Sequence, residues 1–259
     1  MSDILEWAIG QCARPVRGIL HIGANTGQEA GHYAELGLKA VWIEADPQLF
    51  KTLQENLVPW GGQTAYLCLA SDVDGQAVDF HIASNDGGSS SILPFDATKF
   101  AQEWPGIKEV KTIRLQTCRL DTLFARPGCH LNEVNLIVAD VQGYELPVLR
   151  GLGSRISGFD AIISELNWSP TYKGATKPYQ LESFLVSQGF RRLWLGISDI
   201  QATGIWVRGN AGPLKRLHMA LTVRLYYVAA RCGLVRLLRA TGILGLGRRV
   251  YCAVKRRAG

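Results

Sequence analysis

The chain has 259 residues, of which 47% are apolar and 19% charged, so it can bury a full core and does not have the composition of a disordered protein. Its formal net charge of +6 hides an asymmetry, because twelve Lys and Arg and not one acid lie between residues 208 and 257. This polarity predicts a net acidic body, residues 1–207, and a basic extension, residues 208–259.

The amino-terminal segment differs from a secretory signal, because Arg14 and Arg17 follow its apolar part instead of preceding it. No uncharged apolar run reaches the roughly 20 residues that span a bilayer. The six cysteines form no CxxC pair and are not spaced with histidines as zinc ligands. We therefore expect a cytoplasmic body with reduced thiols and no metal site.

Apolar runs alternate with helix-like segments along most of the body. In chain order we predict a strand at Val16–Ile22, a helix at Gly27–Leu36, a strand at Lys39–Glu44, a helix at Pro47–Leu57 and a strand at Thr64–Ala70. The alternation resumes with a strand at Asn135–Asp140, a helix at Tyr144–Gly151, a strand at Ala161–Leu166 and a helix at Pro178–Gln188. Short, continuously apolar strands between helices predict an α/β fold with a mostly parallel, doubly wound sheet.

The alternation of strand-like and helix-like segments is interrupted between residues 71 and 133. Here we predict strands at Ala77–Ala83 and Val110–Thr117 around a Gly/Ser-rich loop, SNDGGSSS at 84–91, which is either a mobile lid or an exposed connection. Two last runs, Leu193–Ile197 and Gly204–Val207, predict an antiparallel finish to the sheet.

A glycine-containing turn, GANTG at 23–27, joins the first predicted strand to the first predicted helix. Ligands of doubly wound sheets lie beyond the carboxyl ends of the strands, next to such turns. The dinucleotide fingerprint requires glycine where this chain has Asn25 and Gln28. A ligand without a pyrophosphate therefore fits better than a nicotinamide dinucleotide, although an ordinary turn between a strand and a helix remains an alternative.

Two acids end predicted strands of the sheet. Glu44 ends the second strand, 21 residues after Gly23, where a carboxylate can accept hydrogen bonds from both hydroxyls of a ribose. Asp140 ends the fourth main strand, where it would lie beside the loop at 23–27 and suit a sulfonium or an ammonium group. Asp140 would also suit the N-cap of a helix. S-adenosylmethionine has a ribose and both cations but no phosphate, so it fits this pattern.

These segments together resemble the FkbM-type family of S-adenosylmethionine-dependent methyltransferases. The resemblance covers about residues 16 to 207 and is carried by IGANTGQ at 22–28, VWIEADP at 41–47, LASDVDG at 69–75, NDGGSSSI at 85–92, RLDTL at 119–123, VADVQGYELPVLRG at 138–151 and ISELN at 163–167. It implies a Rossmann-like class I methyltransferase fold and, usually, methylation of an oxygen of a sugar or natural product.

The resemblance also implies roles for individual residues. Gly23, Asn25 and Gly27 would form the cofactor loop, Glu44 would hold the ribose, and Asp140 would lie at the reaction centre. Ser71 and Asp72 would lie near the adenine.

The chain departs from the family at two positions. His21 stands where the family usually has an Asp that organises the methionine end of the cofactor, and Gln142 stands where an acid is frequent.

A sugar hydroxyl is a poor nucleophile and benefits from a general base. The candidates are Asp140, Glu165 and His81, and we favour Glu165 because ISELN places it at the end of the fifth main strand. For His81, a structural role is the simpler interpretation. For His21, the simpler interpretation is that it replaces a residue that contacts the cofactor in the family.

The segment that follows Glu165, NWSPTYKGATKPY at 167–179, is the candidate acceptor region. Trp168 and Tyr172 offer aromatic faces for a sugar ring, and Asn167 and Lys173 could hold its hydroxyls or an acidic group. The alternative is a loop that places its aromatic side chains in the core.

The basic extension is amphipathic and helical by pattern, with arginines recurring every seven or eight residues from Arg216 to Arg239. Residues 213–257 are thus a candidate for binding an anionic membrane surface, on the inner face of the membrane, next to a lipid-linked glycan. Packing on the body or on a second subunit is the alternative, and nucleic acid is less favoured because stacking aromatics are few.

The leading functional hypothesis is O-methylation of a hydroxyl of a saccharide, on a glycan or glycolipid precursor. The alternatives are a nicotinamide-dependent oxidoreductase and an inactive membrane-associated scaffold of the same fold.

Overall fold

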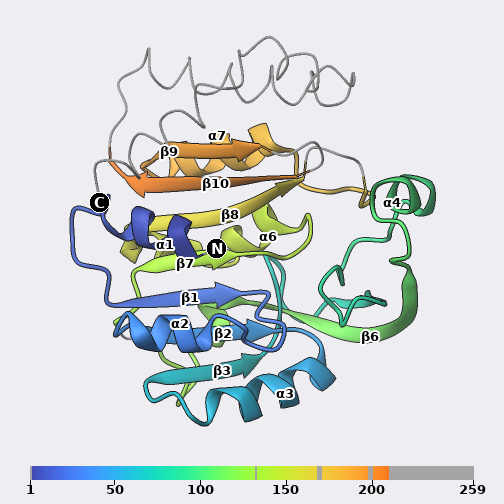
Figure 1. Cartoon of the computed structure of the whole chain (residues 1–259), viewed down its shortest axis with the longest axis horizontal. Helices are drawn as coiled ribbons and strands as arrows, with labels where there is room; N and C mark the ends of the chain where they lie inside the picture. Colours follow the sequence, from blue (N-terminus) through green and yellow to red (C-terminus); the bar gives the residue numbers. More distant parts are fainter. Residues whose placement is uncertain (1, 132, 168–170, 198–200, 210–259) are drawn as a thin grey trace.

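The structure is a computed structural model that describes residues 2–131, 133–167, 171–197 and 201–209. Its centre is a seven-stranded sheet of order β3-β2-β1-β7-β8-β10-β9 (Figure 1). The strands are β1 (Gly18–Ile22), β2 (Lys39–Glu44), β3 (Gln63–Leu67), β7 (Leu136–Ala139), β8 (Ala161–Asn167), β9 (Phe190–Ile197) and β10 (Gln201–Arg208). The strands from β3 to β8 pair in parallel, and β10 pairs antiparallel with both of its neighbours. This confirms the predicted mostly parallel α/β sheet with an antiparallel final strand.

Helices cover both faces of this sheet. On one face pack α1 (Ser2–Ile9), α2 (Ala30–Glu35) and α3 (Pro47–Leu57), and on the other α5 (Leu120–Leu123), α6 (Glu145–Arg150), α7 (Pro178–Ser187) and a 3₁₀ turn at Gly153–Gly158. Successive side chains of a strand point to opposite faces of the sheet, so each strand contributes to the hydrophobic core on both faces. Leu20 and Ile22 of β1 pack on the face of α6 and α7, whereas Ile19 packs on the face of α1 and α2. Both faces of the predicted doubly wound sheet are therefore buried.

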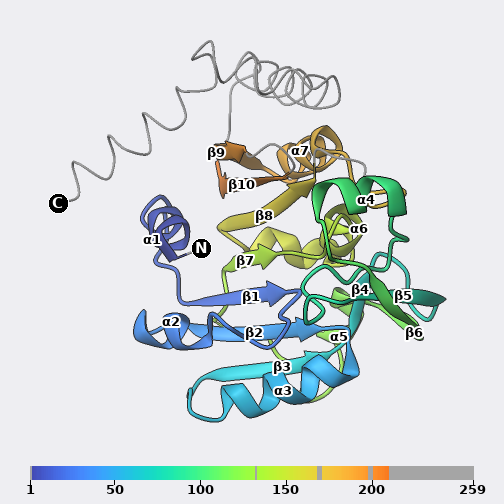
Figure 2. The same ribbon diagram turned by 45° about the vertical axis from the view of Figure 1, so that its right-hand side comes forward.

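A second sheet of three strands lies beyond the carboxyl ends of the parallel strands (Figures 1 and 2). It consists of β4 (Leu69–Ser71), β5 (Ala77–Ala83) and β6 (Glu109–Arg119), and α4 (Ala97–Glu103) lies on the same side of the molecule. The loop 84–91 leaves β5 at this edge. This small sheet therefore faces the edge of the main sheet where a ligand is expected.

Several predicted bounds differ from the structure. The single strand predicted at Thr64–Ala70 is wrong, because β3 ends at Leu67 and the separate strand β4 begins at Leu69. The cause is the length of β2. The N–H of Cys68 donates to the carbonyl of Glu44, which is the last residue of β2. After Cys68 the chain can no longer pair with β2 and pairs with β6 instead. The helix predicted from Gly27 begins at Ala30, since Gly27 adopts a left-handed φ of +75°. Helices α1, α4 and α5 were not predicted.

The predicted division between body and extension, at residue 208, lies at the end of the described sheet and stays a prediction. Arg208 ends β10, and its guanidinium donates to the carbonyl oxygens of Ile156, Phe159 and Gln188. The rest of the predicted extension lies outside the described residues except for Gly209, and membrane binding through residues 213–257 stays a prediction. Among the described helices, none combines the length and the apolar character needed to traverse a bilayer.

The end of β1 approaches the end of β7 so closely that only glycine fits between them. Gly23 has a φ of +84°, and a Cβ at this position would lie 1.8 Å from the carbonyl oxygen of Asp140. Gly37 has a similar φ of +68°, but no atom lies within 4 Å of the place of its Cβ. The two glycines share a conformation and differ in their surroundings.

We therefore expect Gly23→Ala to lower the free energy of unfolding by about 1–3 kcal/mol more than Gly37→Ala. Both variants place an alanine in a left-handed conformation, but only the alanine at position 23 also forces two strands apart. Urea denaturation of both variants measures the difference. Equal losses of stability would contradict the close approach.

Candidate active site

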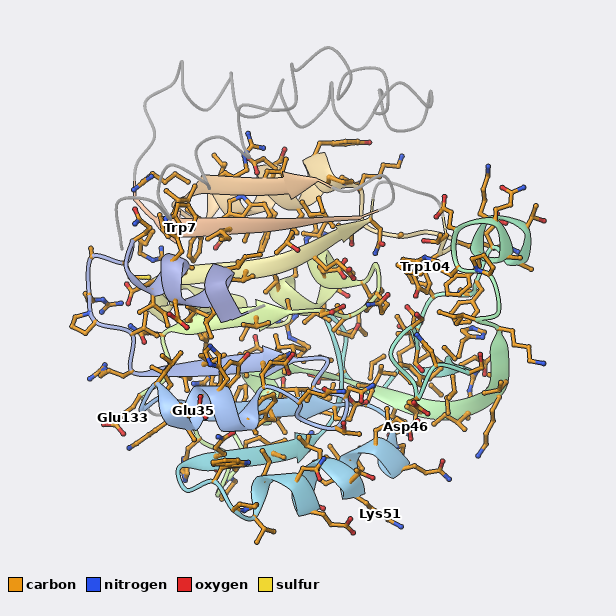
Figure 3. The ribbon with its side chains drawn as sticks, in the orientation of Figure 1. Trp7, Glu35, Asp46, Lys51, Trp104 and Glu133 are labelled. Carbon is orange, nitrogen blue, oxygen red and sulfur yellow. The ribbon has the colours of Figure 1, made fainter. Side chains whose placement is uncertain are left out.

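A pocket of about 320 Å³ opens at the carboxyl ends of β1, β2 and β7. In Figure 3, Asp46, which follows β2, lies on the side of the second sheet, whereas Glu133, which precedes β7, lies at the opposite edge. The residues that line the pocket come from the loop at 21–29, the end of β2, the segment 68–70, β5, the loop 84–92 and the segment 140–148. This is the place at which the sequence predicts a cofactor.

The loop after β1 is shaped by three left-handed residues, Gly23, Asn25 and Gly27. Asn25, with a φ of +48°, organises the loop through its side chain. Its Oδ1 accepts from the N–H of Thr26 at 2.7 Å and from Nε2 of Gln28 at 3.1 Å, and its Nδ2 donates to the carbonyl of Asp86 at 3.0 Å. Gly23 and Asn25 line the pocket, whereas Gly27 turns the chain away from it towards Leu53 of α3.

Glu44 lies at the end of β2 and is fixed by the backbone around it. Its Oε2 accepts from the N–H of Asn25 at 2.7 Å, and its Oε1 accepts from Ala45 at 2.8 Å and from Asp46 at 2.7 Å. Burial raises the pKa of Glu44 to about 7, although these hydrogen bonds favour the ionised form. A carboxylate offers about four acceptor positions, so capacity remains for a ligand hydroxyl.

Asp140 lies at the end of β7 and forms a coupled pair with Glu165 of β8. Nε2 of Gln142 donates to Oδ1 of Asp140 at 2.6 Å and to Oε2 of Glu165 at 3.0 Å, and Asp140 and Glu165 also hydrogen-bond to each other. Burial, followed by the charge of Asp140, raises the pKa of Glu165 well above its usual range. The pair therefore retains one proton near neutral pH and carries a single negative charge.

Ser71, one of the two residues predicted near the adenine, contacts a residue of the pocket wall from behind. That wall is mostly apolar and consists of Cys68, Leu69, Ala70, Phe80, Ile92, Tyr144 and Val148. Ser71 is fully buried, and its hydroxyl lies 3.1 Å from the hydroxyl of Tyr144. Neither Ser71 nor Asp72 is among the residues that line the pocket, so their role near the adenine stays a prediction.

His21 packs its ring among aromatic side chains on the α2 face of β1. The ring stacks on Trp42 at a centroid distance of 4.8 Å, and its Nδ1 lies 2.9 Å from the hydroxyl of Tyr33. Burial lowers the pKa of His21 to about 3, so the imidazole is neutral. His21 borders the pocket, but its nitrogen is engaged by the core and its low pKa makes it a weak base.

His81 lies on β5 and is separate from the pocket. Its Nδ1 lies 2.9 Å from Oε1 of Glu109, and its ring packs near Phe95, at a centroid distance of 6.3 Å. Phe80, not His81, is the residue of β5 that lines the pocket. This geometry gives His81 no contact with the other candidate catalytic residues, Asp140 and Glu165.

The candidate acceptor residues are dispersed. Tyr172 is buried, and its hydroxyl lies 2.9 Å from the carbonyl oxygen of Ser89 and 2.9 Å from Oε1 of Gln142, so its ring belongs to the core. Asn167 is buried, and Lys173 is exposed. Trp168 lies outside the described residues.

The loop 84–91 covers the pocket and is fastened at several points. Gly87, Gly88 and Ser90 line the cavity. Besides the bonds to Asn25 and Tyr172 described above, the hydroxyl of Ser91 donates to the carbonyl of Gln142 at 3.0 Å. The loop is therefore a covering segment of the site rather than an exposed connection.

Sequence reasoning did not identify Glu29, Phe80 or Tyr144 as lining residues. Glu29 is half-buried and directly precedes α2, and burial, together with the charge of Asp140, raises its pKa. The sequence does contain a signal for Glu29, because it is an acid in the cofactor loop of a chain that lacks the usual acid at position 21.

The lining residues fit S-adenosylmethionine. Glu29, Glu44 and Asp140 are acids, and no Lys or Arg is among the residues that line the pocket in the described part of the chain. Such a pocket disfavours a pyrophosphate and suits a ligand that has hydroxyls at one end and positive charge at the other. The apolar wall formed by Leu69, Phe80 and their neighbours suits the face of a purine.

Comparison with known proteins gives one family match, Methyltransferase FkbM domain, over residues 21–192. A comparison with curated proteins finds no match.

Among solved structures, the chain is similar to magnesium protoporphyrin IX methyltransferase from Synechocystis PCC 6803 with bound SAM, at 10% identity and a TM-score of 0.45, covering 80% of this chain and 77% of that one. It is also similar to a SAM-dependent methyltransferase from Aquifex aeolicus, at 9% identity and a TM-score of 0.43, covering 79% and 87%. A third is M. capricolum TrmK with S-adenosyl-homocysteine, at 10% identity and a TM-score of 0.43, covering 81% and 69%.

The family match covers well over half of the chain and includes the loop after β1, Glu44 and Asp140. It confirms the resemblance drawn from the sequence motifs and favours methyl transfer over the nicotinamide-dependent alternative. The chain therefore belongs to the FkbM methyltransferase family, and its cofactor is S-adenosylmethionine.

Proposed function

We propose that this methyltransferase O-methylates a hydroxyl of a saccharide, on a glycan or a glycolipid precursor. The observation that carries the proposal is the Asp140–Glu165 pair, because Asp140 lines the cofactor pocket and the pair can take up a proton there. When bound, S-adenosylmethionine supplies an electrophilic methyl group and a good leaving group, so the protein has to orient the acceptor and accept its proton.

The cofactor lies across the strand ends in this proposal. The Glu44 carboxylate, held by three backbone N–H groups, accepts from the ribose hydroxyls, and Asp140 faces the methionine end. Neighbouring strands are about 5 Å apart, so Glu44 and Asp140, two strands apart, frame a ligand of nucleoside size or larger.

The proton of the acceptor hydroxyl passes to the coupled pair in this proposal. With Glu165 protonated and donating to Asp140, the pair presents one carboxylate charge at the pocket. Gln142 holds both carboxyl groups with its Nε2 and is itself held by the hydroxyl of Tyr172. An acceptor hydroxyl that loses its proton to this pair becomes the stronger nucleophile that methylation requires.

A saccharide is the acceptor class that the surroundings support best. The loop 84–91 brings Gly87, Gly88 and Ser90 to the pocket that Asp140 lines, and these are small, uncharged groups. A phosphorylated acceptor would meet three acids and no basic residue among the described lining residues. A neutral polyhydroxylated ring meets neither obstacle.

The product test incubates the purified protein with S-adenosylmethionine and glycan fractions from the producing cell. We expect one saccharide to gain the mass of a methylene group, with fragmentation placing the methyl group on oxygen, and the same species to vanish when the gene is deleted. A methyl group on nitrogen would contradict the acceptor atom. Cofactor binding without turnover on any fraction would favour the inactive scaffold.

The role of the pair is tested by the double variant Asp140→Asn/Glu165→Gln, with His81→Gln as a control outside the pocket. The double variant should lower kcat at saturating cofactor by about 10²–10⁴, because neither amide can take up the proton, whereas Glu165→Gln alone keeps the Asp140 carboxylate and should lose less. His81→Gln should leave kcat and the Kd for the cofactor at the wild-type values. A wild-type kcat in the double variant would rule out the pair as the base.

The raised pKa of Glu44 predicts a pH dependence of ligand binding. Only the ionised Glu44 carboxylate accepts hydrogen bonds from both ribose hydroxyls. The affinity for a ribose-containing ligand should therefore increase as the pH rises through about 7, and decrease at lower pH, where Glu44 is protonated. The suitable ligand is 5′-methylthioadenosine, which has the ribose but lacks the amino acid.

Calorimetry should give a Kd for this ligand about tenfold higher at pH 6 than at pH 8. Glu44→Gln should bind it weakly and with no such slope. A wild-type protein without the slope, or a variant that keeps it, would show that Glu44 does not hold the ribose.

A further inference from the structure

Position 21 lacks the acid that the family resemblance places at the methionine end of the cofactor. His21 does not replace its charge, because the imidazole is neutral and its Nδ1 is engaged with the hydroxyl of Tyr33. The α-ammonium group of the cofactor therefore needs a negative partner in addition to Asp140, or it binds with one carboxylate fewer than in the rest of the family.

Glu29 is placed to supply this charge. It lies in the loop between β1 and α2 and lines the same pocket as Gly23, Asn25 and Asp140. Its carboxyl group is close enough to interact electrostatically with Asp140, and also with Tyr33, the partner of His21. Glu29 and Asp140 thus line one pocket from two different segments, which follow β1 and β7.

The two carboxylates repel each other when the pocket holds no cation. Burial, and the charge of Asp140 in addition, raise the pKa of Glu29, whereas a hydrogen bond from its own backbone N–H and the nearby His32 lower it. Burial also raises the pKa of Asp140. A cation between the two removes this repulsion and favours the ionised form of both groups. No Lys or Arg among the described residues of the pocket wall competes for that place.

We infer that Glu29 binds the α-ammonium group of S-adenosylmethionine and so supplies the charge that His21 does not. Glu29 is then a cofactor-binding residue, and the loop 23–29 contacts the cofactor with a side chain as well as with its backbone. The inference rests on the cofactor and not on the proposed saccharide acceptor, so the two can fail separately.

The test compares two ligands in one variant. S-adenosylhomocysteine has the amino acid, whereas 5′-methylthioadenosine shares its adenosine and thioether but lacks the ammonium group. We expect Glu29→Gln to raise the Kd for S-adenosylhomocysteine about tenfold or more, the usual effect of losing a hydrogen bond to a charged group, and to change the Kd for 5′-methylthioadenosine less than twofold.

Glu35→Gln is the matched control. It makes the same change of charge at the other end of α2, where Glu35 is exposed and lies away from the carboxyl edge of the sheet (Figure 3). Both Kd values should equal those of the wild-type protein, so a general effect of charge is separated from a local one.

Proton release gives a second readout that a purely structural role would not change. Calorimetry in buffers of different ionisation enthalpy should show that S-adenosylhomocysteine releases protons from the wild-type protein near pH 6, and fewer from Glu29→Gln.

Equal weakening of both ligands in Glu29→Gln would mean that Glu29 only supports the loop, and this would overturn the inference. No weakening of either ligand would overturn it as well. A wild-type protein that binds neither ligand would overturn it together with the cofactor assignment, whereas failure to methylate a saccharide would leave it intact.

Discussion

The site depends on negative charge that is confined at the carboxyl ends of β1, β2 and β7. Glu29, Glu44 and Asp140 line one cavity, and in the described part of the chain no basic side chain shares its wall. Burial raises the pKa of all three groups, so part of their charge is suppressed until a ligand compensates for it. At Glu44 this cost of ionisation is reduced by the three backbone N–H groups that point at the carboxylate. Such a pocket suits a ligand that has both hydroxyls and cationic groups, and we propose that Glu44 binds the hydroxyls and Asp140 the cationic end.

Much of the fold was predictable because its signals are local. Helix α3 was predicted with its observed bounds, since Asp46 caps it by accepting from the N–H of Gln48 and Pro47 suits its first turn. The strand bounds of β2 and β5 were also predicted as observed. The split between β3 and β4 was not predictable, because the segment is continuously apolar and the break comes from the end of a neighbouring strand. Pairing partners of this kind are set by tertiary structure and leave no mark on the segment itself.

The same distinction explains which site residues could be found. Glu44 and Asp140 end parallel strands, and the strand alone places such residues at the ligand edge. Glu29 escaped prediction because its position depends on the start of α2, which lies three residues later than the sequence pattern indicates. Phe80 reaches the pocket from the second sheet, and no local pattern encodes where that sheet is placed. Tyr172, a candidate either for stacking on a sugar or for a place in the core, is buried, and its hydroxyl lies 2.9 Å from Oε1 of Gln142.

The two departures from the family pattern have different physical consequences. The alternation of β1 turns position 21 towards α2, where Trp42 and Tyr33 enclose it, and a neutral imidazole suits that aromatic setting better than a carboxylate does. The lost charge has to come from elsewhere if the cofactor is to be bound as in relatives, and this is the role we propose for Glu29. An acid in place of Gln142 would instead add a third carboxyl group within 3.0 Å of two that already share a proton. The amide needs no replacement charge, because its two N–H hydrogens hold Asp140 and Glu165 while leaving the pair free to exchange a proton with the acceptor.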